Sequence, residues 1–165
     1  MLYEIKGKCQ LCHSSYKIII SDTHSRGICD ECGEKPLSFK KYEGVVYVIN
    51  NPNQKGVKIG LTTKGIDKRV RELETTGVAG KFKKVAIFPS FHPKNDEKKA
   101  HDNLKKYRLD KEHFQIEPTQ AVLKIFRALN RKVDPIFFDK EIEQSFYDEK
   151  EKARRTMLKN LGKID

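Results

Sequence analysis

The chain has 165 residues, of which 35% are charged and 37% apolar, with a formal net charge of +11. This composition is typical of a soluble globular protein and excludes a disordered chain. No apolar run approaches the roughly 18–20 residues of a membrane span. The amino-terminal residues lack the basic and then apolar pattern of an export signal. We therefore expect an intracellular, cytoplasmic protein with no membrane partner.

The positive charge is concentrated in the middle of the chain. Residues 1–38 and residues 139–165 each contain as many acidic as basic side chains, so the whole surplus lies in residues 39–138. A concentrated surplus of this kind attracts the phosphate backbone of a nucleic acid. The alternative is a generic basic surface that serves only solubility.

Two CxxC units near the amino terminus predict a metal site. Cys9 and Cys12 form the first unit, and Cys29 and Cys32 form the second. Two such units together supply four thiolates, which close a tetrahedral structural zinc site. A redox pair of the thioredoxin type is the weaker alternative, because no βαβ pattern surrounds either unit.

The residues between the two units complete the prediction of a zinc-ribbon-like module over residues 1–38. Tyr16–Ile20 is β-branched and reads as a strand, and Ser21–Gly27 reads as a turn. His13 and His24 are spare potential ligands, although four thiolates already suffice. Without zinc, a segment this short has too few apolar residues to fold alone.

The central segment alternates strand-like and helix-like patterns. Together these elements predict an α+β fold, with a small antiparallel sheet flanked by helices. The expected elements are a strand at 45–50, a turn at 51–56, a strand at 57–61, a helix capped by Thr62, Thr63 or Asp67 and ending at Gly77, a strand within 81–88, a helix opened by Asn95 or Asp96 and ending near Tyr107, and a short strand at 113–116.

Four short motifs stand in order along this segment. The triplet VVY ends at Tyr47, and the triplet KIG begins at Lys58. The stretch KRVREL contains Arg69, and EKKAH runs from Glu97 to His101. Each motif is weak alone, whereas the four together at this spacing are fairly specific.

In this order the motifs resemble the GIY-YIG endonuclease superfamily, and its phage-type branch in particular. VVY stands at the position of Gly-Ile-Tyr, and KIG at that of Tyr-Ile-Gly. The resemblance covers residues 44–118 and implies a GIY-YIG-like nuclease domain over 39–118. It implies Mg²⁺- or Mn²⁺-dependent hydrolysis of phosphodiester bonds, with double-stranded DNA as the expected partner. A phage-encoded enzyme acting in the host cytoplasm would fit this branch.

The resemblance also implies catalytic roles. Tyr47 would be the general base, and Lys58 on the same sheet face would favour its phenolate by lowering its pKa. Arg69 would bind phosphate oxygens with its planar fork, and Glu97 would be the protein ligand of Mg²⁺. His101, one turn after Glu97, would orient phosphate, shuttle a proton or pack.

Several positions depart from the family pattern. Lys58 replaces the second tyrosine, and Leu73 stands where many relatives have a histidine. The late asparagine of the family has its nearest matches in His113 and Gln115. Two other functions therefore remain open: a zinc-containing nucleic-acid-binding protein without activity, and a zinc adaptor that binds another protein.

Residues 119–165 predict a helical extension. Thr119–Val133 has an amphipathic pattern that would cover the sheet, and Asp139 opens a long helix to about Leu161. The apolar stripe of the long helix is thin. It would dock only at its ends or pair with a second copy in a homodimer.

Overall fold

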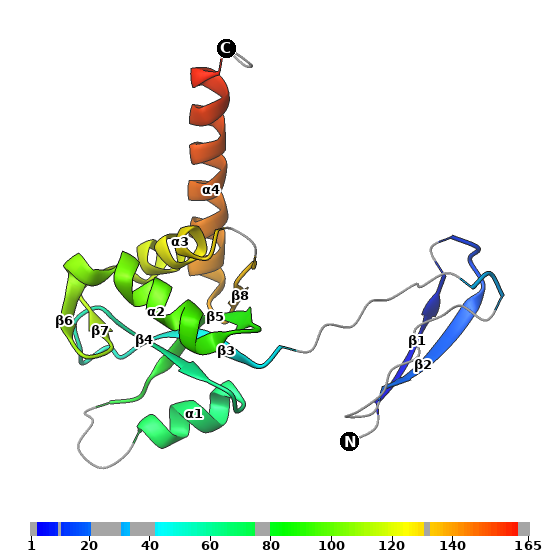
Figure 1. Ribbon diagram of the computed structural model, residues 1–165, viewed down its shortest axis with the longest axis horizontal. Coiled ribbons are helices and arrows are strands. Elements are labelled where there is room, and N and C mark those ends of the chain that lie inside the picture. Colours follow the sequence, from blue (N-terminus) through cyan, green and yellow to red (C-terminus); the bar gives the residue numbers. More distant parts are fainter. Residues whose placement is uncertain are drawn as a thin grey trace. The chain divides into compact units, whose positions relative to one another are not determined.

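The computed structural model describes residues 3–9, 11–20, 31–33, 42–74, 80–130 and 133–161. The chain forms two compact units, Met1–Lys41 and Tyr42–Asp165 (Figure 1). Among the described residues, no helix combines the length and the apolar character needed to cross a lipid bilayer.

The first unit contains an antiparallel β-hairpin. β1 (Tyr3–Lys8) pairs with β2 (Ser15–Ile20), and Lys8 lies opposite Ser15 next to the connecting turn. The predicted strand at Tyr16–Ile20 is therefore confirmed. The expected turn at Ser21–Gly27 lies outside the described residues.

The second unit is built on a six-stranded antiparallel sheet with the order β6-β7-β4-β3-β5-β8. The β-branched run GVVYVIN forms its central strand, as expected for side chains that pack well on a pleated surface. The sheet confirms the predicted α+β class. Its strands are β3 (Gly44–Asn50), β4 (Val57–Thr62), β5 (Lys83–Ser90), β6 (Arg108–Asp110), β7 (His113–Phe114) and β8 (Ile136–Phe137).

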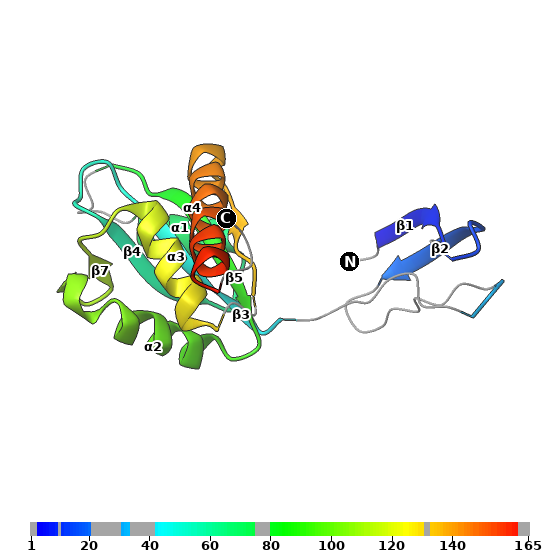
Figure 2. The same ribbon diagram turned by 90° about the horizontal axis from the view of Figure 1, so that it is seen from above.

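Helices cover both faces of this sheet. α2 (Pro93–Asn103) and α3 (Pro118–Ala128) pack on the face that carries Val46, Val48 and Ile59. In Figure 2, α2 and α3 lie over the strands on this side together with α4 (Lys140–Asn160). α1 (Ile66–Leu73) packs on the opposite face, over Tyr47 and Ile49.

α1 begins without any of the side-chain caps expected for it. Its N-cap is Gly65, and no side chain there accepts a cap hydrogen bond. The hydroxyl of Thr62 instead accepts a hydrogen bond from the backbone N–H of Lys64 at 3.0 Å, which tightens the loop before the helix. Asp67 lies in the first turn, where its negative charge interacts favourably with the positive end of the helix dipole. The expected end at Gly77 lies outside the described residues.

α2 begins earlier in the chain than the sequence pattern predicts. Pro93 occupies its first turn and His92 its N-cap position, so neither Asn95 nor Asp96 opens the helix. The carboxylate of Asp96 instead accepts a hydrogen bond from the Ser90 hydroxyl at 2.6 Å, which ties α2 to the end of β5. A short 3₁₀ helix, η1 (Lys105–Tyr107), follows α2.

Both carboxyl-terminal helices form where the sequence pattern predicts them, although α3 ends at Ala128 rather than at Val133. Asp139 caps α4 by accepting hydrogen bonds from the backbone N–H groups of Glu141 and Ile142. Phe146 is fully buried against α3, whereas Met157 is 60% exposed. α4 therefore docks through its first half, and Figure 1 shows its second half extending away from the sheet.

Candidate functional site

The described cysteines of the first unit form one cluster. The sulfur atoms of Cys9, Cys12 and Cys32 all lie within 4.8 Å of one another, and those of Cys9 and Cys32 are 3.9 Å apart. A tetrahedral zinc site with Zn–S bonds of about 2.3 Å separates its sulfur atoms by about 3.8 Å. The three thiol groups thus fit a metal such as zinc, while Cys29 lies outside the described residues.

In each CxxC unit, the residue that follows the second cysteine has a left-handed backbone conformation. His13 directly follows Cys12 and has φ 59°, and Gly33 directly follows Cys32 and has φ 69°. Only glycine adopts this left-handed region without a steric cost, so His13 is held there by its surroundings. The N–H of His13 donates to the Cys9 carbonyl at 2.9 Å, which closes the first turn. His24 lies outside the described residues.

In the second unit, the β3–β4 hairpin brings the predicted tyrosine and lysine to one face of the sheet. Tyr47 lies directly opposite Gly60, and Ile49 lies opposite Lys58. Because side chains alternate between faces, Tyr47, Lys58 and Gly60 all belong to the face covered by α1. The expectation that Tyr47 and Lys58 project from the same face is confirmed.

Tyr47 is fully buried under α1, and its hydroxyl has no hydrogen-bond partner of good geometry among the described residues. Burial raises the pKa of the Tyr47 hydroxyl, and the nearby Arg69 guanidinium opposes this rise. The Lys58 ammonium group instead pairs with the Glu112 carboxylate, and Arg69 is the cation with the main effect on the Tyr47 hydroxyl. Arg69 therefore has the effect on the Tyr47 pKa that the sequence pattern predicted for Lys58.

Glu112 lies in the tight turn between β6 and β7 and contacts the centre of the site. Its carboxylate forms an ion pair with Lys58, whose side chain is only 12% exposed. Its backbone carbonyl accepts a hydrogen bond from the N–H of Ile59 at 2.9 Å. His113 lies opposite Lys58 in the next pair of strands, and burial followed by the Lys58 charge lowers its pKa.

Beyond the Lys58–His113 pair, the edge of β4 is contacted by the Glu112 carbonyl and by side chains rather than by β7. α2 packs on the far face of the sheet, but its side chains reach this edge. The Nε2 atom of His101 lies 2.9 Å from the carbonyl oxygen of Ile59 and can donate to it. Burial raises the pKa of the Glu97 carboxyl, and Glu112 adds to the rise, while His101, the Leu61 N–H and Lys58 oppose it.

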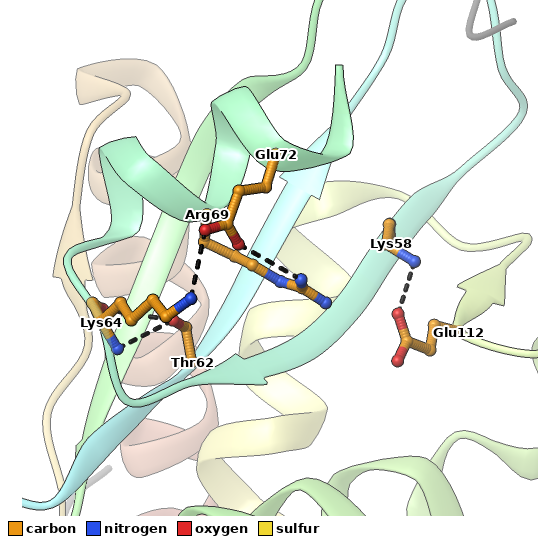
Figure 3. Close-up of polar contacts among 6 residues, drawn as sticks. All are labelled: Lys58, Thr62, Lys64, Arg69, Glu72 and Glu112. Carbon is orange, nitrogen blue, oxygen red and sulfur yellow. Dashed lines mark hydrogen bonds and ion pairs between the residues drawn. The ribbon is translucent and has the colours of Figure 1, made fainter. Parts of the chain in front are cut away.

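Arg69 projects from α1 across β4, toward the pair formed by Lys58 and Glu112 (Figure 3). Its guanidinium also lies 3.7 Å from the Glu72 carboxylate, one turn further along the helix. An open hollow of about 260 Å³ lies beside it. The hollow is lined by Leu61, Thr62, Thr63, Lys64, Arg69 and Glu72.

The five residues selected from the sequence therefore share one neighbourhood, although they come from two strands and two helices. Glu112 acts electrostatically on Tyr47, Arg69 and Glu97, and pairs directly with Lys58. His101 belongs to the same group through Glu97.

Sequence reasoning missed Glu112 and Glu72. The sequence signal for Glu112 was its place in the polar run DKEH, which favours a turn before the strand expected at 113–116. In the structure Lys111 of this turn has φ 39°. Glu72 gave no signal beyond being one helical turn from Arg69.

Comparison with known proteins identifies the family of the second unit. The model of the T5orf172 domain matches residues 44–130, which is just over half of the chain. The chain belongs to the T5orf172 domain family. This phage-associated domain is related to nucleases of the GIY-YIG and HNH kinds, so a nuclease-like or DNA-binding function follows for the second unit. Neither a curated protein nor a solved structure matches the chain.

Proposed function

We propose that this T5orf172 protein is a metal-dependent endonuclease that hydrolyses phosphodiester bonds of DNA at a GIY-YIG-like site. One observation carries the proposal. Tyr47, Lys58, Arg69, Glu97 and His101 meet beside β4, although they are spread over more than fifty residues of sequence. If these five residues had only separate structural roles, we would not expect their side chains to lie in one neighbourhood.

Arg69 would bind the scissile phosphate. Its planar guanidinium matches two phosphate oxygens and can stabilise the charge that develops on them during hydrolysis. Movement of the guanidinium onto the phosphate would also weaken its interaction with the Tyr47 hydroxyl. Tyr47 would then accept a proton from the attacking water in its phenolate form, which only a small fraction of the molecules carries at neutral pH because burial raises the pKa of the hydroxyl.

Glu97 would hold a Mg²⁺ or Mn²⁺ ion. Its carboxyl is partly buried but remains next to polar groups, and hard divalent cations take carboxylate oxygens as ligands. The bound ion would supply Lewis-acid stabilisation of phosphate oxygens. His101, held through Nε2 by the Ile59 carbonyl, would orient Glu97 or the leaving oxygen. Lys58 would add positive charge beneath the phosphate once Glu112 is displaced from it.

The first unit would be a structural Cys₄ zinc module, with Cys29 as the fourth ligand. The three clustered sulfur atoms and the left-handed backbone at both His13 and Gly33 support this assignment. A thiolate zinc site also suits the reducing cytoplasm, where we expect the protein to act. The division into a zinc module, a nuclease domain over 39–118 and a helical extension over 119–165 remains part of the proposal.

Double-stranded DNA is the proposed substrate. The basic surplus of residues 39–138 supports it, because phosphate contacts supply most of the affinity in such complexes. Pairing of two copies through α4 is a further part of the proposal, supported by the exposed Met157 and Leu161 on its second half.

A nucleic-acid-binding protein without activity is the second candidate. The burial of Tyr47 favours it, because a water molecule cannot reach a fully covered hydroxyl without a local movement. Supercoiled plasmid incubated with Mg²⁺ or Mn²⁺ separates the two candidates. Nicking by the wild-type protein that is lost with Arg69→Ala and Glu97→Ala supports the nuclease. Retained DNA binding without nicking under any metal supports the second candidate.

A further inference from the structure

Glu72 joins two cations across the open hollow at the end of β4. The Nζ atom of Lys64 lies 3.3 Å from one oxygen of its carboxylate, and the Nη1 atom of Arg69 lies 3.7 Å from the other (Figure 3). The lysine belongs to the loop before α1, and the arginine and the glutamate belong to α1 itself. One carboxylate thus occupies the place where two cations converge.

These contacts are longer than those of a strong ion pair. Charge-assisted hydrogen bonds in well-formed pairs measure about 2.7–2.9 Å, and exposed pairs contribute little to stability. The Glu72 side chain is 36% exposed. Its pKa is lowered, with Lys64 as the first cause, so the carboxylate is charged at neutral pH. A stronger anion could therefore replace it at low energetic cost.

We propose that this hollow binds a non-scissile phosphate of the nucleic-acid backbone and that the Glu72 carboxylate is its internal occupant, displaced when the strand binds. The inference rests on the proposed function, since it takes DNA as the ligand. A phosphate diester carries the same charge as the carboxylate. It brings in addition the release of counterions from the DNA, which the internal carboxylate cannot supply.

The lining of the hollow fits a phosphate next to the one that is cleaved. Of the proposed catalytic residues, only Arg69 borders it. Thr63 and Lys64 add a hydroxyl and an ammonium donor, both of which are common in backbone contacts. Arg69 would lie between two consecutive phosphates of one strand. When the strand displaces the Glu72 carboxylate from the Arg69 guanidinium, the guanidinium becomes free to move, so strand binding would control the position of the arginine.

A matched pair of variants tests this proposal. Glu72→Gln and Asp67→Asn each remove one negative charge from α1, and each releases a lysine from an ion pair. Only Glu72 borders the hollow. Equilibrium binding of the full-length variants to a fluorescent DNA duplex is measured without divalent metal, at several salt concentrations.

We expect Glu72→Gln to tighten binding by roughly fivefold or more relative to Asp67→Asn at low salt, a typical coupling between two competing contacts. Lys64→Ala should weaken DNA binding. It should also reduce the slope of the logarithm of affinity against the logarithm of salt concentration by the amount expected for about one phosphate contact. In the Lys64→Ala background, the gain from Glu72→Gln should shrink. Equal affinities of Glu72→Gln and Asp67→Asn would overturn the proposal, because charge alone would then explain the effect.

The result separates this inference from the proposed function. A gain specific to Glu72→Gln in a protein that never nicks plasmid supports the phosphate site and contradicts the nuclease. If the wild-type protein nicks plasmid but Glu72→Gln and Asp67→Asn change DNA affinity equally, the phosphate site is contradicted and the nuclease is not. Absence of DNA binding by the wild-type chain contradicts both.

Discussion

Tyr47 and Gly60 face each other across the central hairpin, and the tyrosine ring fills the space that a side chain at position 60 would need. A Cβ atom on Gly60 would lie 2.5 Å from the Tyr47 hydroxyl oxygen and 2.7 Å from the adjacent ring carbon. No real contact of this kind is that short, so the pair is sterically coupled. The glycine of the KIG triplet is required by the tyrosine of the VVY triplet.

Gly60→Ala should therefore displace the Tyr47 ring. We expect a loss of about 1–3 kcal/mol in the free energy of unfolding, the usual cost of overpacking a core, together with loss of DNA cleavage. Urea denaturation of the full-length protein measures the first effect.

Tyr47→Leu provides the control for this prediction, because it removes the ring that the new methyl group would meet. In that background Gly60→Ala should cost much less, which gives a coupling free energy between the two positions. If Gly60→Ala lowers the free energy of unfolding equally in both backgrounds, a clash with the Tyr47 ring is not the reason for glycine at position 60.

The pH dependence of cleavage should report the ionisation of Tyr47. Burial raises the pKa of this hydroxyl, so at any given pH less phenolate is present than in an exposed tyrosine, whose pKa is about 10. The logarithm of the single-turnover rate should rise with pH, at a slope near one, through pH 9. A plateau below pH 8 in the wild type would exclude Tyr47 as the base. Tyr47→Phe should lack the slope as well as most of the activity.

The ion pair between Lys58 and Glu112 should contribute to stability. Because Lys58 is only 12% exposed while Glu112 is 34% exposed, we expect a coupling of about 1–2 kcal/mol, between the values of surface and buried pairs. A double-mutant cycle with Lys58→Met and Glu112→Gln measures it. Lys58→Met should also leave the pH slope of cleavage unchanged, since Arg69 is the cation near Tyr47. A changed slope would restore Lys58 to the role expected from the sequence.

His13→Gly should tighten zinc binding by the first unit. Histidine at φ 59° pays a steric cost that glycine avoids, about 1 kcal/mol for a left-handed residue. Competition with a chelator should show an affinity about fivefold higher than that of the wild type. His13→Ala is the control, because it removes the imidazole without relieving the backbone. If both substitutions weaken zinc binding, His13 is a ligand and the backbone argument fails.

Much of the second unit follows from local pattern. The apolar, β-branched runs VVYVIN and VKIGLT predicted β3 and β4, and the two-residue period of a strand predicted the shared face of Tyr47 and Lys58. Asp139 was recognisable as the cap of α4 because a short acidic side chain precedes an amphipathic run. In these cases neighbours in sequence decide the structure.

Long-range contacts explain what the sequence did not reveal. β6 has three exposed residues and β8 has two residues, so neither carries an apolar alternation. β8 forms by pairing with β5, which is distant in the chain, whereas β6 forms a tight hairpin with β7. The partner of Lys58 is Glu112, 54 residues away, and no local rule connects the two. The sequence pattern suggested Thr62 as one possible cap of α1. In the structure the Thr62 hydroxyl bonds the Lys64 N–H in the loop before the helix instead of an N–H of the helix itself.

The proposed nuclease activity depends on the binding of a metal ion by Glu97 beside β4. Glu97→Gln and Asp102→Asn each remove one carboxylate charge from α2, but Asp102 is exposed and not among the groups that act on Glu97. The decisive measurement is the rate of plasmid nicking by both variants over a titration of Mg²⁺ and Mn²⁺. We expect Glu97→Gln to lose at least a hundredfold in rate, and Asp102→Asn to match the wild type. Nicking by Glu97→Gln at the wild-type rate and metal requirement would show that Glu97 does not bind the catalytic metal ion.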